Sequence, residues 1–332
     1  MGRKGGEETM PLTFDIIDDG NIIWKLGAGT TAVTIEYSKN GGAWTSITST
    51  SEGTTIPVVA GDEVKFRGNT WTAPSNSYSH FNSTCTFAAK GNPASLRYGD
   101  VLTGKEPMTD GNYLRLFQDA TLMITPPVLP ATILSPDCYM YMFMGCTSLM
   151  YAPELPATTL ESTCYSNMFR GCTSLAAAPE LPATTLESSC YLNMFYGCTS
   201  LAAAPELPAT TLAQGCYNSM FRGCTSLREA PDLPATTLAN NCYANMFYDC
   251  TSLILAPELE APVLVQGCYY YMFRNCSQLS QIICPATDIS ASSALSNWVS
   301  GVAAQGTFYK AAGVNWITGP GGIPSGWTVI EV

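Results

Sequence analysis

The chain divides into two regions with different periodicities of apolar and polar residues. Between Leu12 and Gly68, apolar and polar side chains alternate in six short stretches: LTFDII, NIIWKL, AVTIEYS, WTSITS, TTIPVV and EVKFRG. The segment YSKNGGAWTSI carries the glycines of a β-hairpin turn. Alternation with a period of two is typical of half-buried strands, so residues 11–97 are predicted to form a small all-β sandwich that docks or anchors the chain. Residues 1–10 are polar and are expected to form a flexible arm.

The second periodicity is a repeat of 26 residues. LPATTLESSCYLNMFYGCTSLAAAPE at 181–206 is nearly copied at 155–180, and further copies begin at Leu129, Leu207 and Leu233, with a looser one at Leu259. A fixed period of this length is typical of stacked units that complete each other's core. Residues 129–284 are therefore predicted to hold six repeats. Residues 98–128 and 285–332 are predicted to be the N-terminal and C-terminal caps, because terminal repeats expose one face to water.

Each repeat is predicted to contain one short helix and one strand. Cys190, Tyr191, Met194, Phe195 and Cys198 fall on one face of a helix, and the glycine at 197 is a residue type that ends helices. The following segment CTSLAAAPELP is expected to run as a strand, and stacked strands would form a parallel sheet at about 4.8 Å per repeat. In the C-terminal cap, a helix is predicted over 294–303 and a strand over 306–310. The fold class predicted is a mixed α/β solenoid behind an all-β sandwich.

One string in the repeats carries a family resemblance. M-F-x-G-C-T-S-L, as in MFRGCTSL at 168–175, is similar to the BspA-like leucine-rich repeats of bacterial surface antigens, in the Cys/Tyr-rich variant of gut Bacteroidales and their phages. The resemblance covers about 110–284, and the preceding β-domain and the GIPSGWTV ending also look like neighbours of such repeats. It implies a right-handed solenoid with a parallel sheet on one face and extracellular adhesion or recognition. It implies no enzyme activity.

Charge and composition narrow the partners. The chain is 46% apolar, only 12% charged, and has a formal net charge of −11. Residues 129–284 hold eleven acidic residues against four arginines, which gives seven of those negative charges. Nucleic-acid binding needs a basic face, so a nucleic-acid partner is not expected. No run of 18 apolar residues predicts a membrane span, and the N-terminal residues show no secretory signal.

The cysteines form the most regular chemical pattern. Twelve of the fourteen occur as pairs eight residues apart, one pair per repeat, from Cys138/Cys146 to Cys268/Cys276. Zinc sites favour closer ligands and often a histidine, and the only histidine, His80, lies outside the repeats. A disulfide within a repeat is disfavoured because eight residues of helix separate the pair by about 12 Å. Two stacked ladders of buried thiols are the favoured reading, with disulfides as the alternative.

Three further ladders of side chains recur once per repeat. The position after the MF pair reads Met144, then Arg170, Tyr196, Arg222, Tyr248 and Arg274. Arginine and tyrosine are enriched in binding hot spots, so these five residues are partner-binding candidates, with simple surface cover as the alternative. A second candidate is the acidic ladder of Glu154, Glu180, Glu206, Asp232 and Glu258, which is solvated or bridged by a cation such as Ca²⁺. The tyrosines from Tyr139 to Tyr269 are expected in the core, with a sugar-binding strip as the alternative.

The function expected from these patterns is non-catalytic binding, with no cofactor and no metal. The chain has no Ser/His/Asp set, GxSxG elbow, P-loop or GxGxxG motif. The favoured identity is a phage virion fibre, decoration or receptor-binding component exposed on the particle and contacting the bacterial host surface. A secreted or cell-surface bacterial adhesin is the alternative, and a carbohydrate-active enzyme is the remote one. Expected partners are a cell-surface protein or glycan and other virion or surface proteins bound through the N-terminal domain. A homo-oligomer is the further alternative.

Overall fold

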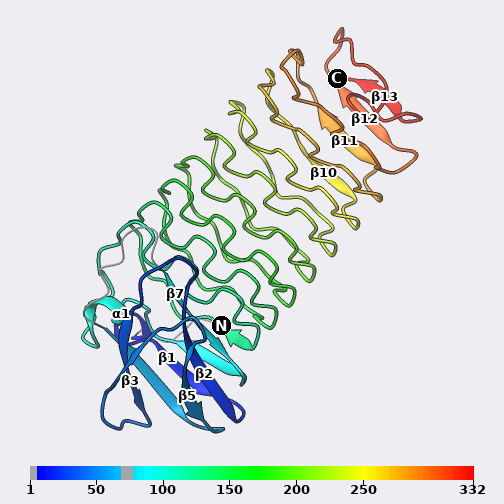
Figure 1. Ribbon diagram of the computed structural model, residues 1–332. Coiled ribbons are helices and arrows are strands. Elements are labelled where there is room, and N and C mark those ends of the chain that lie inside the picture. Colours follow the sequence, from blue (N-terminus) through cyan, green and yellow to red (C-terminus); the bar gives the residue numbers. More distant parts are fainter. Residues whose placement is uncertain (1–5, 69–77) are drawn as a thin grey trace.

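A β-domain stands at one end of a long stack of coils in the computed structural model, which describes residues 6–68 and 78–332 (Figure 1). The β-domain contains two sheets, with strand orders β4-β3-β6-β1-β8-β9 and β5-β2-β7. Its elements are η1 (Glu7–Thr9), β1 (Thr13–Ile16), β2 (Gly20–Leu26), β3 (Thr34–Lys39), β4 (Thr45–Thr48), β5 (Thr54–Val58), β6 (Glu63–Arg67), β7 (Ser79–Ser83), β8 (Phe87–Lys90), α1 (Ser95–Tyr98) and β9 (Met123–Thr125). Of the predicted arm, residues 1–5 lie outside the described residues.

The two sheets pack face to face around aromatic side chains. Phe14 on β1 of the larger sheet meets Phe81 on β7 of the smaller one, with ring centroids 5.0 Å apart. Trp24 on β2 lies 4.6 Å from Phe81, and its indole N–H donates to the Val33 carbonyl, so this buried ring has its polar atom satisfied. Each of the six alternating stretches contains a strand, β1 to β6, and the layered arrangement is a β-sandwich.

The predicted hairpin is present as β3 and β4, which pair antiparallel. Its turn has Asn40 and Gly41 at φ 53° and 72°, and the Gly42 N–H donates to the Lys39 carbonyl at 2.9 Å. Asn-Gly is the pair of residues that most easily adopts positive φ at both central positions of a turn. The hairpin prediction is confirmed.

The sandwich and the coils share one core. β9 lies in the first coil but pairs in parallel with β8 of the larger sheet. Phe117 of that coil is 5.8 Å from Phe81 of the sandwich and 5.6 Å from Phe143 of the next coil, centroid to centroid. The sandwich therefore closes the apolar end of the stack. The predicted boundaries at 97 and 128 run through this shared core.

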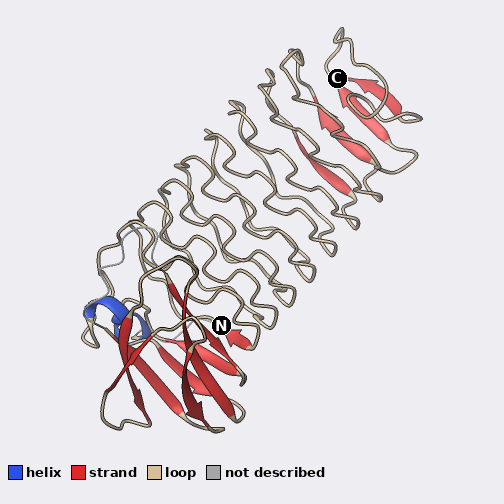
Figure 2. Ribbon diagram, in the orientation of Figure 1, coloured by secondary structure: helices blue, strands red, loops and turns tan. Residues whose placement is uncertain are grey.

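The helix predicted in each repeat is wrong. In the coil 181–206, the N–H groups of Tyr191, Asn193 and Phe195 donate to carbonyls of the next coil at 2.9–3.0 Å, whereas those of Leu192 and Met194 donate to the third residue before them. An α-helix would send every N–H to the fourth residue before it. The backbone is instead a run of β-turns whose alternate N–H groups tie each coil to the next, drawn as loops in Figure 2.

The turns follow a period of four. Ser189, Asn193 and Gly197 have φ of 56°, 55° and 74°, a left-handed conformation that an α-helix does not contain. Equivalent residues in every other coil are also left-handed, and most are Gly, Asn, Asp or Ser. The inward residues Cys190, Tyr191, Met194, Phe195 and Cys198 recur at the same interval. Over nine residues, a period of 4.0 and a period of 3.6 place these side chains on the same face, which explains the error.

The parallel sheet predicted along the coils is present at the C-terminal end only. β10 (Leu255–Glu258), β11 (Gln281–Cys284), β12 (Thr307–Lys310) and β13 (Thr328–Glu331) form a four-stranded parallel sheet. The earlier coils show isolated bridges, such as Glu229 with Leu255. Their APELP segments carry two prolines, which lack the N–H that a ladder needs, and β11 carries none.

The C-terminal cap repeats the same correction. The helix predicted over 294–303 is absent, because Ser293, Asn297 and Gly301 are left-handed at the same four-residue interval. The strand predicted over 306–310 is confirmed as β12, and the last apolar segment forms β13. Trp298 ends both aromatic ladders, at 6.2 Å from Tyr269 and 6.0 Å from Phe273, so a larger ring covers the last coil.

Candidate functional site

The most strictly repeated residues are buried inside the coils. All fourteen cysteines are buried free thiols. The second cysteine of each repeat donates its Sγ–H to the phenylalanine carbonyl of the preceding coil, as Cys198 does to Phe169 at 3.1 Å. Burial raises the pKa of the Cys198 thiol to about 12, so it stays protonated and remains a donor at neutral pH. The prediction against a disulfide rested on the geometry of a helix, and that helix is absent. The cysteines of both ladders are nevertheless unpaired and lie in the core.

The tyrosine ladder is also core. Successive rings such as Tyr191 and Tyr217 stack at 5.7 Å with an interplanar angle of 5°, and each is about 1% exposed. Burial raises the pKa of both hydroxyls well above the ordinary value. With their faces covered by neighbouring rings, these tyrosines offer no platform to a sugar.

The Arg/Tyr stripe, defined as Arg170, Tyr196, Arg222, Tyr248 and Arg274, forms one continuous cation–π stack. Arg170 lies 4.8 Å and Arg222 5.3 Å from the Tyr196 ring centroid. Arg222 and Arg274 lie 4.2 and 5.4 Å from that of Tyr248. Five consecutive coils each contribute one member, and the turn geometry holds them in register. The structure thus brings all five predicted residues together.

Sequence reasoning missed the aromatic residues that extend this stripe. Tyr271, which precedes Arg274 by three residues, lies under its guanidinium at 4.8 Å and is 4.1 Å from Tyr270. Arg115 of the first coil stacks on Tyr141 of the next coil at 4.2 Å. The sequence signal for Tyr271 was its place three residues before Arg274, a spacing that makes neighbours on a helix as well.

The five acidic residues of the predicted ladder are all exposed, on the face that carries the proline-rich segments. Glu180 and Glu206 border a groove of about 520 Å³ between adjacent coils, lined mainly by the alanines and prolines around them. Among the described residues, no group of three or more His, Cys, Asp or Glu side chains is placed to hold a metal ion. The structure thus places all five carboxylates of the predicted ladder at the solvent-exposed surface.

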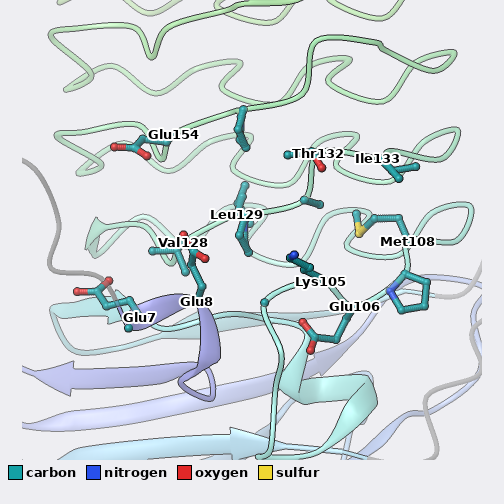
Figure 3. A pocket seen from close by; sticks show the side chains of 16 residues that line it. Glu7, Glu8, Lys105, Glu106, Met108, Val128, Leu129, Thr132, Ile133 and Glu154 are labelled. Carbon is teal, nitrogen blue, oxygen red and sulfur yellow. The ribbon is translucent and has the colours of Figure 1, made fainter.

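A larger cavity of about 790 Å³ lies where the β-domain meets the first coils (Figure 3). It is lined by three glutamates of the N-terminal region, by Lys105 and by apolar side chains that include Met108, Leu129 and Ile133. Figure 3 shows Glu7 and Glu154 on one side of it and Met108 and Ile133 on the other. This cavity could not be predicted from the sequence, because residues from three separate segments and the ladder residue Glu154 line it together.

Glu106 is the most fixed polar group of this cavity. Its Oε1 accepts hydrogen bonds from the N–H and hydroxyl of Thr103. Burial acts to raise the pKa of Glu106, but these hydrogen bonds outweigh it and the pKa is lowered. Its Oε2 is buried and has no hydrogen-bond partner among the described residues. A negative charge is thus held at the cavity wall.

No family model matches the chain, and neither a curated protein nor a solved structure is significantly similar to it. The described residues include no helix long and apolar enough to cross a membrane. What the fold defines is a stack of 26-residue coils, closed by a β-sandwich at one end, with one charged aromatic stripe along its length.

Proposed function

We propose that the protein is a non-catalytic binding protein in which a leucine-rich-repeat solenoid of the BspA-like type displays a recognition surface. The observation that carries the proposal is the division of labour within each coil. Cys190, Tyr191, Met194 and Phe195 are at most 1% exposed and serve packing alone. Part of the variation between copies lies at the surface, as at the position occupied by Arg170, Tyr196 and Arg222, where a partner can distinguish the coils.

The surface acted on is that of a bacterial cell, and the protein is a fibre, decoration or receptor-binding component of a phage virion. The resemblance of MFRGCTSL at 168–175 to repeats of gut Bacteroidales and their phages supports this placement. The secreted or cell-surface adhesin, which would bind host proteins or glycans, is the competing placement. The two differ in which cells are bound.

Full-length protein carrying a fluorescent label tests both statements. Binding to cultured gut Bacteroidales is expected, with no binding to animal epithelial cells whose surface hyaluronan has been removed by hyaluronidase; the reverse result supports the adhesin. Substitutions on the coil surface, such as Glu180→Lys with Glu206→Lys or Arg170→Gln with Arg222→Gln, are compared with Thr45→Lys on the exposed face of the sandwich. At least one coil variant is expected to bind about tenfold more weakly.

Two results would contradict the proposal. Loss of cell binding in the sandwich variant alone would assign recognition to the β-domain. Release of reducing sugars from bacterial polysaccharide by purified protein would show an enzyme.

A further inference from the structure

The Arg/Tyr stripe carries positive charge that the described residues do not neutralise. All ion pairs among the described residues lie outside residues 129–284, for example Arg67 with Glu36 and Lys310 with Glu331. The guanidiniums of Arg170, Arg222 and Arg274 have tyrosine rings as neighbours and no carboxylate. The Nε atoms of Arg222 and Arg274 are buried and have no hydrogen-bond partner among the described residues. A ligand cannot reach these buried atoms, but Arg170 is exposed and Arg222 and Arg274 are partly exposed, so their outer N–H groups can donate to an anionic ligand.

The stacking fixes these guanidiniums before a ligand arrives. Arg222 lies between two tyrosine rings, at 5.3 and 4.2 Å from their centroids. A side chain held in one arrangement loses less entropy on binding than a free arginine does. The planar fork also suits two-point contact with a carboxylate, sulfate or phosphate group. The stripe is therefore suited to anions.

The stack also excludes the usual way in which aromatic residues bind neutral sugars. Tyr196 has Arg170 and Arg222 as stacking neighbours, and Tyr248 has Arg222 and Arg274. Their rings are engaged by guanidinium groups, so a sugar ring cannot lie on them without displacing an arginine. Recognition along the stripe then depends on the charges of the ligand.

The spacing of the charges selects among polyanions. Arg170 and Arg222 lie 4.8 and 5.3 Å from the centre of the Tyr196 ring between them, so these two guanidiniums stand at most about 10 Å apart. A nucleic-acid strand places a phosphate about every 3.4 Å, roughly three for each arginine. The surplus phosphates would face a chain whose net charge is −11. A polymer with one charge per pair of sugars meets the arginines with little surplus.

We infer that the Arg/Tyr stripe binds an acidic polysaccharide that carries one anionic group on every second sugar. The inference rests on the proposed recognition role of the coil stack and names its ligand class. Three regularly spaced guanidiniums engage three successive anionic groups, while the tyrosines hold the guanidiniums apart and in register.

The direct test is titration of full-length protein with hyaluronan fragments, which carry a carboxylate on alternate sugars. Neutral dextran and a single-stranded DNA oligonucleotide are the comparison probes. Binding to hyaluronan that weakens with added salt is expected, with no binding to dextran, because screening reduces attraction between exposed charges. Tighter binding to DNA than to hyaluronan would overturn the inference, as would equal binding to dextran.

The variants assign the effect to the stripe. Arg222→Gln is expected to weaken hyaluronan binding about tenfold, and the triple variant with Arg170→Gln and Arg274→Gln to abolish it. Arg222→Lys keeps the charge but loses the fork, so it should fall between wild type and Arg222→Gln. The matched control is Arg228→Gln, which removes an exposed arginine elsewhere on the same coils and should leave binding unchanged. Equal weakening by Arg228→Gln would show a net-charge effect and overturn the inference.

Cell binding separates this inference from the proposed function. If the triple variant binds bacterial cells as wild type does and still binds hyaluronan, the stripe is not the polyanion site, and the recognition role stands. If wild type binds no bacterial cells but binds hyaluronan through the stripe, the proposed bacterial target fails and the ligand class stands. Thermal unfolding of each variant confirms that the fold is intact.

Discussion

The β-sandwich and the coil stack bury aromatic side chains in opposite ways. In the sandwich, Phe14 meets four different phenylalanines at 4.6–6.0 Å, with interplanar angles from 37° to 79°. In the stack, Phe195 meets Phe169 and Phe221 at 5.6 and 5.7 Å, both at 5°. The sandwich core is an irregular cluster closed in three dimensions. The stack is a one-dimensional series in which each coil depends on its neighbours.

The two regions also differ in their polar chemistry. Among the described residues, the sandwich has carboxylate–amine and carboxylate–guanidinium pairs, such as Lys90 with Asp15 at 2.8 Å. No such pair lies within the repeats, where most buried polar groups are thiols and hydroxyls. A region that depends on protonated buried groups and a region that depends on surface ion pairs should respond differently to pH and to substitution. The following predictions use that difference.

Alkaline pH is expected to unfold the coil stack before the sandwich. Burial raises the pKa of Cys164 and Cys198 to about 12 and of Cys268 to about 11, whereas unfolded thiols titrate near 8.5. Between those values the unfolded chain has lost protons that the folded chain keeps, so stability falls as pH rises. Thirteen of the fourteen cysteines lie in the coils or their C-terminal end, and one, Cys85, lies in the sandwich.

Limited proteolysis with mass spectrometry at pH 8 and pH 10.5 checks this order. At the higher pH, the first cuts are expected within 129–284, and Cys198→Ala should move their onset to higher pH because one titrating group is gone. After unfolding at pH 8 without reductant, all fourteen cysteines should react with iodoacetamide. First cuts in the sandwich would refute the comparison, and incomplete alkylation would reveal disulfides.

The extent to which the sequence predicted this fold follows the same division. Alternation with period two specified β1 to β6, and Asn40-Gly41 specified the hairpin, because these signals have few structural alternatives. The 26-residue period and its inward residues were also readable. The helix was not excluded, because Cys190 to Cys198 spans too few residues to separate a period of 3.6 from one of 4. The left-handed positions, where Asn193 and Gly197 stand four apart, were the overlooked signal.

Truncating one ring of the phenylalanine ladder is the next largest change. Phe195→Ala should destabilise the protein by about 3–5 kcal/mol, as usual for a fully buried ring. Because coupling in the stack passes between neighbours, Phe195→Ala with Phe221→Ala should depart from additivity by about 0.5–3 kcal/mol. Phe195→Ala with Phe273→Ala, three coils apart, should be additive. Urea unfolding of the three single and two double variants measures both coupling energies, and equal coupling at both separations would contradict a one-dimensional stack.

A substitution at a left-handed position tests the turn geometry directly. Asn193 has φ 55°. This left-handed conformation costs most residues with a Cβ about 1–2 kcal/mol, but Asn and Asp tolerate it, and glycine, which has no Cβ, adopts it freely. Asn193→Ala is therefore expected to destabilise the protein by about 1 kcal/mol. If this segment were a helix, the same change would stabilise it by about 0.5 kcal/mol. Asn193→Gly is the matched control and should be close to neutral, so urea unfolding of this pair distinguishes the two backbones by sign.

The smallest expected losses of stability come from replacing one arginine in each region. Arg67 of the sandwich lies 4.1 Å from the Trp44 ring centroid and is also paired with Glu36 and Asp100 at 2.8 and 3.1 Å. Arg222 of the stripe has aromatic neighbours but no carboxylate. Arg67→Gln should destabilise the protein by about 1 kcal/mol, since its pairs are partly exposed, and less in 1 M NaCl.

Arg222→Gln removes only cation–π contacts and should cost about 0.5 kcal/mol, with little dependence on salt. Urea unfolding at low and high NaCl, with Arg228→Gln as the baseline for an exposed arginine, measures the difference. A larger, salt-sensitive loss at Arg222 than at Arg67 would mean that the stripe arginine is a structural residue with hidden ionic partners. The expected result, a small loss of stability beside a large loss of polyanion binding, is the behaviour of a residue held in place for a ligand.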